Sequence, residues 1–150
     1  MNPSSETPVI ALRNPKHATD WLATRTIFME YAASLNVDLC FQGFEQELNT
    51  LPGEYSEPRG ALLLAWVDGA VAGCCALRPF DASDYANAAE MKRLYVRPAY
   101  RGLGLGRLLT EGILDAARAA AYHCVLLDTL DDMEAARALY EDLGFVEIPP

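Results

Sequence analysis

The sequence predicts a single α/β domain over residues 1–150, with elements in the order β-α-α-β-β-β-α-β-α-β. Three observations carry this prediction. A glycine-rich turn at residues 101–107 joins a strand-like run to a strongly periodic helix. The pair Asp68-Gly69 lies between two apolar runs and is the strongest short hairpin signal in the chain. A length of 150 residues suits one domain with a sizeable buried core.

The first third of the chain predicts an edge strand and two helices. Residues 9–13 are a short apolar run that ends at Asn14-Pro15. Thr19 or Asp20 is a suitable N-cap for the first helix. The apolar side chains of that helix are Trp21, Leu22, Ile27, Phe28, Tyr31 and Leu35. A second helix is expected over about residues 41–51, closed by Pro52-Gly53.

The middle of the chain predicts three strands. Residues 61–67 and 70–77 form the two arms of the hairpin, and Pro79 ends the second arm. Residues 80–88 are small and polar, which indicates a loop. Residues 89–96 then form the strand that leads into the glycine-rich turn.

The last third predicts two helices and two strands. The first helix has apolar residues at helical spacing, namely Leu105, Leu108, Leu109, Gly112, Ile113, Ala116, Ala117 and Ala120. Residues 123–127 are almost continuously apolar, which is typical of a buried strand. Asp131 or Asp132 should cap the last helix, and Gly144 should end it. The inward side chains of that helix are Ala135, Ala136, Leu139, Tyr140 and Leu143, and residues 145–148 form a short final strand.

The composition excludes several classes of protein. The chain is 51% hydrophobic with a net charge of −9, which argues against disorder, a nucleic-acid-binding scaffold and adhesion to anionic membranes. An acidic protein is compatible with a cationic or amine substrate. The four cysteines lack C-x-x-C spacing, and no signal peptide or long apolar span is present. We therefore expect reduced thiols and a cytoplasmic location.

The glycine-rich turn predicts an anion-binding site. A helix N-terminus has free backbone N–H groups and a partial positive charge, and glycine lets the backbone approach a ligand closely. Residues 91–110 contain no Asp or Glu, and their basic residues are Lys92, Arg93, Arg97, Arg101 and Arg107. This positive segment on an acidic chain favours a polyanionic cofactor over a nucleic acid.

The glycine spacing excludes two common phosphate-binding motifs. No Lys-Ser/Thr pair follows, as a P-loop requires, and the pattern G-x-G-x-x-G fails at Arg107 or Leu109. The segment does match Arg-x-x-Gly-x-Gly, from Arg101 to Gly106. With Glu-Met-Lys-Arg-Leu-Tyr-Val upstream and Leu-Tyr-Glu-x-x-Gly-Phe downstream, the chain resembles the Gcn5-related N-acetyltransferases, the GNAT family.

The resemblance covers nearly the whole chain and implies both a fold and a reaction. The fold would be a mixed, mostly antiparallel sheet with helices on both faces, splayed beside Val96. The reaction would transfer an acetyl group from acetyl-coenzyme A (acetyl-CoA) directly to an amine, without a metal. The cofactor would contact Leu94, Tyr95, Val96, Arg101, Gly102, Leu103, Gly104, Leu105, Gly106 and Arg107.

The resemblance also implies two catalytic side chains. Glu90 lies eleven residues before Arg101, where the histone-modifying branch of the family has its catalytic base. We expect it on the same face of its strand as Leu94 and Val96; the alternative is a glutamate that binds substrate or forms a salt bridge, for example with Lys92. Tyr140 matches the tyrosine beside the coenzyme sulfur and is the candidate acid, with a plain core tyrosine as the alternative.

The acceptor pocket is the least readable part of the sequence. The candidates for contact with the acceptor are Gln42, Phe44, Tyr55 and Arg78, and Arg78 is suited to hold a substrate carboxylate. The acceptor would be an amine of a small molecule or a protein. A coenzyme A-binding sensor or partner-binding module without turnover is the second hypothesis. The pair Glu90 and Tyr140 favours the enzyme, because a binding module needs neither.

The family usually has one more strand, placed between the two strands expected at residues 123–127 and 145–148. This chain ends at Pro149-Pro150, so we expect that last strand to be missing. Residues 145–148 should then be short, weakly paired, or paired with a neighbouring subunit of a homodimer.

Overall fold

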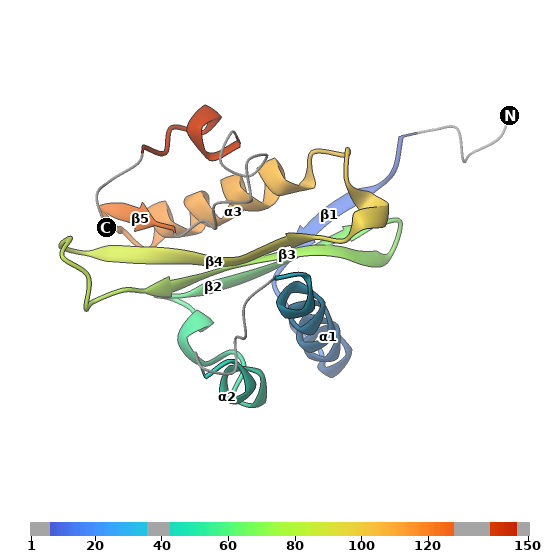
Figure 1. The fold of residues 1–150 in the computed structure, drawn as a ribbon, viewed down its shortest axis with the longest axis horizontal. Coiled ribbons are helices and arrows are strands. Elements are labelled where there is room, and N and C mark those ends of the chain that lie inside the picture. Colours follow the sequence, from blue (N-terminus) through green and yellow to red (C-terminus); the bar gives the residue numbers. More distant parts are fainter. Residues whose placement is uncertain (1–6, 36–42, 128–138, 147–150) are drawn as a thin grey trace, which may run out of the picture.

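The computed structural model of the protein describes residues 7–35, 43–127 and 139–146. Its centre is a five-stranded sheet in the order β1-β2-β3-β4-β5 (Figure 1). The strands are β1 (Ile10–Arg13), β2 (Ala61–Val67), β3 (Ala70–Pro79), β4 (Ala88–Val96) and β5 (Cys124–Leu126). The first four pair antiparallel and β5 pairs parallel with β4. The expectation of a mixed, mostly antiparallel sheet with residues 9–13 at its edge is confirmed.

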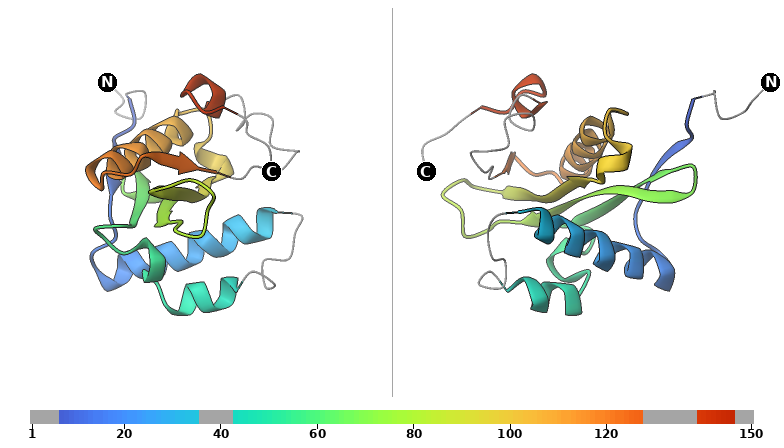
Figure 2. Two further views of the ribbon diagram at one scale, coloured as in Figure 1. Left: turned by 90° about the vertical axis from the view of Figure 1, so that its left-hand side faces the viewer. Right: turned by 45° about the vertical axis from the view of Figure 1, so that its right-hand side comes forward.

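Helices cover both faces of the sheet, as expected. The long helix α3 (Leu105–Ala119) lies on one face, while α1 (Ala18–Ser34), α2 (Phe44–Asn49) and the short helix η3 (Gly53–Tyr55) lie on the other (Figures 1 and 2). The α3 face buries Leu105, Leu109 and Ile113 against the sheet, and the opposite face buries Ile27 and Phe28. Each of these side chains contributes about 1.5–3 kcal/mol by leaving water. One further short helix, η4 (Pro98–Tyr100), leads from β4 into the glycine-rich turn.

Local turn chemistry accounts for the connections. Asp68 and Gly69 both have positive φ, +50° and +87°, the type I′ geometry that joins β2 to β3. Helix α1 begins differently from the prediction, since His17 is its N-cap. Asp20 lies in the first turn of the helix, and its carboxylate accepts hydrogen bonds from the backbone N–H groups of Lys16 and His17. These hydrogen bonds lower the pKa of Asp20.

The end of the last helix matches the prediction. Residues 139–142 are helical, and Gly144 follows with φ +99°. The N–H of Phe145 donates to the carbonyl of Tyr140, and the N–H of Gly144 donates to that of Glu141. This is a Schellman motif, completed by an edge-on contact between the Tyr140 and Phe145 rings. The expected caps Asp131 and Asp132 lie outside the described residues.

The region of β5 is more open than the sequence suggested. All three residues of β5 are only half-buried, although their apolar run predicted a fully buried strand. The reason is that no strand of the described residues lies beyond β5 in the sheet. Phe145 and Val146 belong to no strand, so the first half of the strand expected over residues 145–148 is absent, while Glu147 and Ile148 lie outside the described residues.

Two adjacent cysteines on β3 should be chemically inert. Cys74 and Cys75 point to opposite faces and are fully buried, and burial raises the pKa of both thiols, whereas Cys124 is half-buried. We expect a thiol reagent at about pH 8 to label Cys124 in the native protein and to label Cys74 and Cys75 only after denaturation. Mass spectrometry of the labelled peptides measures this. Equal labelling of Cys75 and Cys124 in the native protein would contradict it.

Among the described helices, none is long and apolar enough to cross a lipid bilayer. Nor do the described residues contain a cluster of three or more His, Cys, Asp or Glu side chains suited to hold a metal ion.

Candidate active site

The central feature of the site is a fork in the sheet. Strands β4 and β5 pair from Ala88↔Cys124 to Glu90↔Leu126. Beyond Glu90, β4 continues to Val96, but no described strand pairs with it on that side. An unpaired strand edge presents backbone N–H and C=O groups to whatever lies beside it. The fork therefore leaves the second half of β4 able to bind an extended ligand as a further strand would.

The direction of the Val96 backbone supports this interpretation. The N–H of Arg97 donates to the carbonyl of Ala72 at 2.8 Å, so the facing pair Gly73↔Val96 exchanges no hydrogen bonds of its own. The N–H and C=O of Val96 consequently point away from β3, toward the open edge. The carbonyl accepts a hydrogen bond from Arg101 Nε at 3.0 Å.

The glycine-rich turn forms a row of backbone donors. Gly102 and Gly104 have φ of +90° and +78°, which glycine adopts without strain. Gly104 is the N-cap of α3, and the first bond into the helix runs from the N–H of Leu108 to the carbonyl of Gly104. Among the described residues, the N–H groups from residue 102 to residue 107 have no acceptor. This arrangement suits a phosphate, as predicted.

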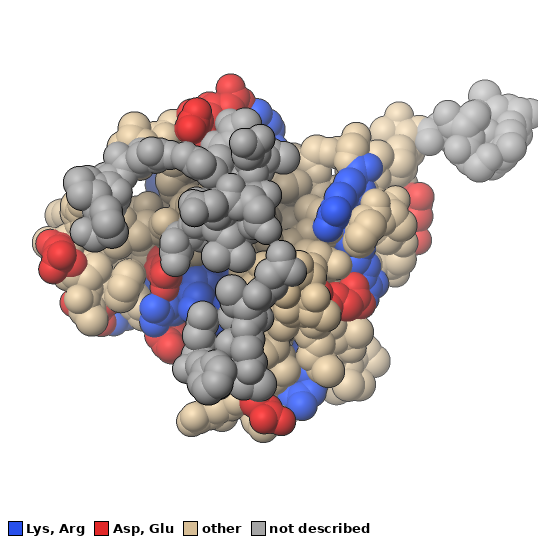
Figure 3. All heavy atoms as spheres, in the orientation of Figure 1, with Lys and Arg blue, Asp and Glu red and all other residues tan. Residues whose placement is uncertain are grey.

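The positive segment expected around this turn is largely neutralised by acids distant in sequence. Arg93 pairs with Glu47, Arg97 with Glu30, and Arg107 with Asp142. On the face drawn in Figure 3, basic side chains lie scattered beside acidic ones and form no large basic patch. The attraction for an anion therefore comes mainly from the backbone donors and Arg101.

A β-bulge in β4 corrects one prediction. The register between β3 and β4 shifts around Cys75, and Arg93 has φ +63°, in the left-handed region. After the bulge, Leu94 and Val96 pack with the α3 face, whereas Glu90 points to the opposite face. The expectation that Glu90 shares a face with Leu94 and Val96 was wrong, because it assumed unbroken alternation.

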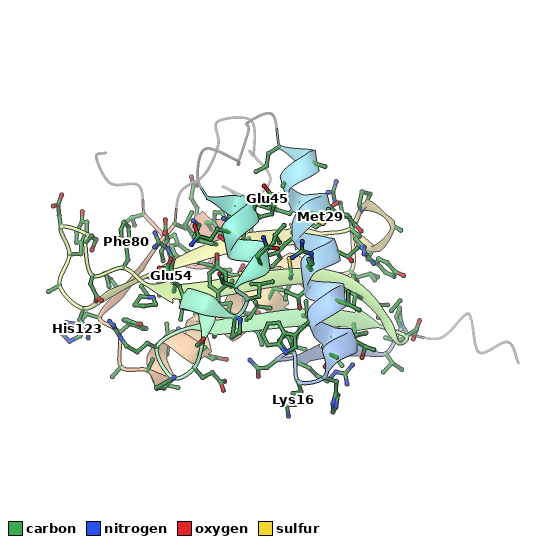
Figure 4. All side chains as sticks on the ribbon, turned by 90° about the horizontal axis from the view of Figure 1, so that it is seen from below. Lys16, Met29, Glu45, Glu54, Phe80 and His123 are labelled. Atoms are coloured by element: carbon green, nitrogen blue, oxygen red, sulfur yellow. The ribbon has the colours of Figure 1, made fainter. Side chains whose placement is uncertain are left out.

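Glu90 is half-buried in a network of three charges. Arg78 donates from Nε to Glu90 at 2.7 Å and from Nη1 to Glu54 at 2.9 Å, and its guanidinium stacks 4.9 Å from the Phe80 ring centroid. Glu54 and Phe80 lie at the same end of the sheet (Figure 4). The salt bridge expected for Glu90 as the alternative is present, with Arg78 as its partner and not Lys92. Arg78 is thereby occupied, which argues against its expected role of holding a substrate carboxylate.

Tyr140 lies on the other side of the sheet from Glu90. It packs in the core of the α3 face with Ala89, Met91 and Phe145, and it is 7% exposed. Burial raises the pKa of its hydroxyl, so the group keeps its proton well above neutral pH. The two catalytic candidates therefore lie on opposite faces of the sheet.

Two of the residues expected to line the acceptor pocket lie in the core. Tyr55 is 4% exposed and meets Phe28 edge-on with ring centroids 6.2 Å apart, and Phe44 is buried beneath the guanidinium of Arg93. Burial raises the pKa of Tyr55. Neither ring presents an open surface to an acceptor, which corrects that expectation. Gln42 lies outside the described residues.

Sequence reasoning missed the ion pair between the buried Arg93 and the half-buried Glu47. Arg93 donates from Nε and Nη2 to the two carboxylate oxygens of Glu47, at 3.0 and 2.8 Å. The two residues are 46 positions apart, so no local pattern links them. The signal available was the pair Lys92-Arg93, because charged residues on a central strand are seldom buried unless they have a partner.

Comparisons with known proteins agree with the fold. A model of the acetyltransferase (GNAT) family matches residues 21–145. An uncharacterized N-acetyltransferase of Schizosaccharomyces pombe is 36% identical over 151 residues, covering 100% of this chain and 88% of that protein. The crystal structure of a GNAT-family acetyltransferase from Staphylococcus aureus superposes with a TM-score of 0.77 at 19% identity, covering 94% of this chain and 87% of that one. The structure of an acetyltransferase from Salmonella typhimurium, solved with its cofactor acetyl-CoA, superposes with a TM-score of 0.67 at 24% identity. The match covers 91% of this chain and 79% of that one.

Proposed function

Because this chain belongs to the GNAT acetyltransferase family and is an acetyl-CoA-dependent N-acetyltransferase, we propose that donor and acceptor meet at the fork between β4 and β5. The donor would lie along the α3 face and the acceptor would approach from the face of α1 and α2. The observation that carries this proposal is that, within residues 7–35, 43–127 and 139–146, no strand pairs with β4 beyond Glu90 on the side of β5, although β4 continues to Val96.

The glycine-rich turn fits the pyrophosphate of acetyl-CoA. The N–H groups of Gly102, Leu103, Gly104, Leu105, Gly106 and Arg107 lack acceptors within the described parts of the chain. Hydrogen bonds from such groups to a charged oxygen are worth about 1.5–3 kcal/mol each. Arg101 would add a guanidinium. Because the guanidinium of Arg107 pairs with Asp142, Arg107 would contribute only its backbone N–H.

The open edge of β4 would hold the pantetheine arm. Val96 directs its N–H and C=O toward that edge, and Leu94, whose side chain lies on the same face, is proposed to do likewise. Tyr95, between them, pairs with Cys74 and anchors the strand to β3. A backbone N–H of Leu94 aimed at the thioester oxygen would stabilise the charge that develops there.

Glu90 and Tyr140 would move the protons. Acetyl-CoA supplies the acetyl group as an activated thioester. Glu90, at the base of the fork on the acceptor face, would accept a proton from the amine, directly or through one water. Tyr140, on the donor face, would donate its hydroxyl proton toward the sulfur as the thiolate leaves. With base and acid on opposite faces of the sheet, the amine and acetyl-CoA would approach the site from different sides.

The acceptor is proposed to be a primary amine of a small molecule or a protein. A panel of amines, amino acids and lysine-containing peptides, each incubated with acetyl-CoA and the protein, tests this through release of free thiol. Turnover of at least one amine supports the proposal. Binding of acetyl-CoA without turnover of any amine would favour the sensor hypothesis instead.

We further propose that residues 1–150 act as one acetyltransferase domain in the cytoplasm, where the buried thiols of Cys74 and Cys75 would stay reduced. A homodimer is a separate proposal, which light scattering of the purified protein tests.

Replacing Glu90 with glutamine should lower kcat by about a hundredfold, because general base catalysis contributes about 10²–10⁴. The kinetic parameters distinguish the roles, since loss of a base lowers kcat whereas loss of a substrate contact raises the KM of the amine. Glu54→Gln is the matched control: it removes the same charge from the other, mostly exposed partner of Arg78. If Glu90→Gln raises only the KM of the amine, Glu90 binds substrate and is not the base.

A further inference from the structure

Arg93 occupies an unusual position in the sheet. It is the left-handed residue of the β4 bulge, with φ +63°, a conformation that residues with a Cβ disfavour. It is also 4% exposed, although it carries a full charge. Such conformations persist only where the surrounding structure imposes them. The contacts that Arg93 makes must therefore hold it in this conformation.

These contacts join Arg93 to the two α-helices, α1 and α2, on the face from which the acceptor is proposed to approach. The guanidinium forms two parallel hydrogen bonds with Glu47 of α2. Its carbon lies 5.3 Å from the ring centroid of Phe44, also on α2, and 5.7 Å from that of Tyr31 on α1. On the backbone side, Cys74 Sγ donates to the carbonyl of Arg93 at 3.1 Å. One side chain thus connects the bulge to α1 and α2.

The bulge determines how the edge of β4 is presented. Met91, before the bulge, packs toward α3. Leu94 and Val96, after the bulge, also pack toward α3, whereas an unbroken strand would put their side chains on the opposite face from Met91. The extra residue of the bulge therefore places the side chains of Leu94 and Val96 in the α3 core, while Glu90 points to the face of α1 and α2. If the strand were to flatten at Arg93, the backbone groups from Leu94 to Val96 would be rotated away from their present directions.

We propose that the pair of Glu47 and Arg93 is a positioning clamp for the acetyl donor: it holds the left-handed bulge of β4 and thereby orients the backbone groups of Leu94 and Val96 at the open edge. The inference rests on the proposed binding of the pantetheine arm at that edge. Neither Glu47 nor Arg93 touches the reacting atoms in this scheme. Their effect on catalysis passes through the backbone of β4.

The experiment separates the bulge conformation from the ion pair. Glu47→Gln removes the half-buried carboxylate that would otherwise be left without its partner, and this variant serves as the reference. In that background, Arg93→Ala keeps a Cβ at φ +63°, whereas Arg93→Gly accepts the same backbone without strain. Both lose the same guanidinium. The readouts are the dissociation constant of coenzyme A by calorimetry, the KM of acetyl-CoA, and thermal stability.

We expect the glycine variant to retain coenzyme A affinity within about threefold of the reference. The alanine variant should lose about tenfold, because only a fraction of its molecules would keep the bulge in the conformation that binds the donor. Asn87, with φ +52° in the loop before β4, supplies the matched control. Asn87→Ala and Asn87→Gly should differ in stability without changing donor affinity.

Two results would overturn the inference in different ways. Equal loss of donor affinity in the alanine and glycine variants would mean that the guanidinium matters and the bulge conformation does not. Unchanged donor affinity in both, together with a difference in thermal stability, would mean that the donor does not use this edge of β4. The second result would also remove the proposed pantetheine site, whereas the first would leave it intact.

Discussion

Replacing Gly104 with valine should raise the dissociation constant of coenzyme A by at least about a hundredfold, because two lost charge-assisted hydrogen bonds cost about 3–6 kcal/mol together. Gly104 has φ +78° at the N-cap of α3. A branched Cβ disfavours that conformation and would stand where a phosphate must approach the backbone. Calorimetric titration with coenzyme A measures the loss, and acetyl-CoA should no longer protect the variant against thermal unfolding.

Gly69 provides the control for this substitution. It has φ +87° in the hairpin between β2 and β3, and an added Cβ there meets no atom within 4 Å, as is also true at Gly104. Gly69→Val therefore imposes the same kind of backbone strain at a distance from the proposed phosphate site. It should lower thermal stability and leave coenzyme A affinity unchanged. Wild-type affinity in Gly104→Val would remove the glycine-rich turn from the donor site.

Replacing Tyr140 with phenylalanine should lower kcat by about a hundredfold and change coenzyme A affinity by less than about threefold, since a general acid contributes about 10²–10⁴ to the rate and little to binding. The ring would keep its edge-on contact with Phe145, so the core of the α3 face should stay intact. Because burial raises the pKa of Tyr140, its hydroxyl should remain protonated, and its activity should not decline through deprotonation as the pH rises from neutral to about 10.

Tyr122→Phe is the matched control for Tyr140→Phe. The Tyr122 hydroxyl donates to the carbonyl of Arg59 at 2.6 Å, so its loss removes a hydrogen bond that has no role in the proposed chemistry. That variant should lose stability by about 1 kcal/mol and retain its kcat. If Tyr140→Phe turns over as fast as the wild type, Tyr140 is a core residue and another group protonates the thiolate.

The features that the sequence predicted correctly are those encoded within a few neighbouring residues. The hairpin at Asp68-Gly69 follows from two positions that tolerate positive φ, and the end of the last helix follows from Gly144. Helix α3 follows from apolar residues at helical spacing after the glycine-rich turn. The resemblance to the GNAT family rested on the same local motif, so the amino-acid order was enough to indicate the family.

The tertiary structure alone decided how charges and faces are arranged. The orientation of Leu94 and Val96 relative to Glu90 depended on a bulge at Arg93. The sequence does not mark this bulge, because the left-handed arginine pairs with Glu47, which lies on helix α2, 46 residues earlier. The positive segment lost most of its free charge to partners 35 to 67 residues away. Local patterns report the preferences of single segments, whereas ion pairs and strand register result from the contacts between segments.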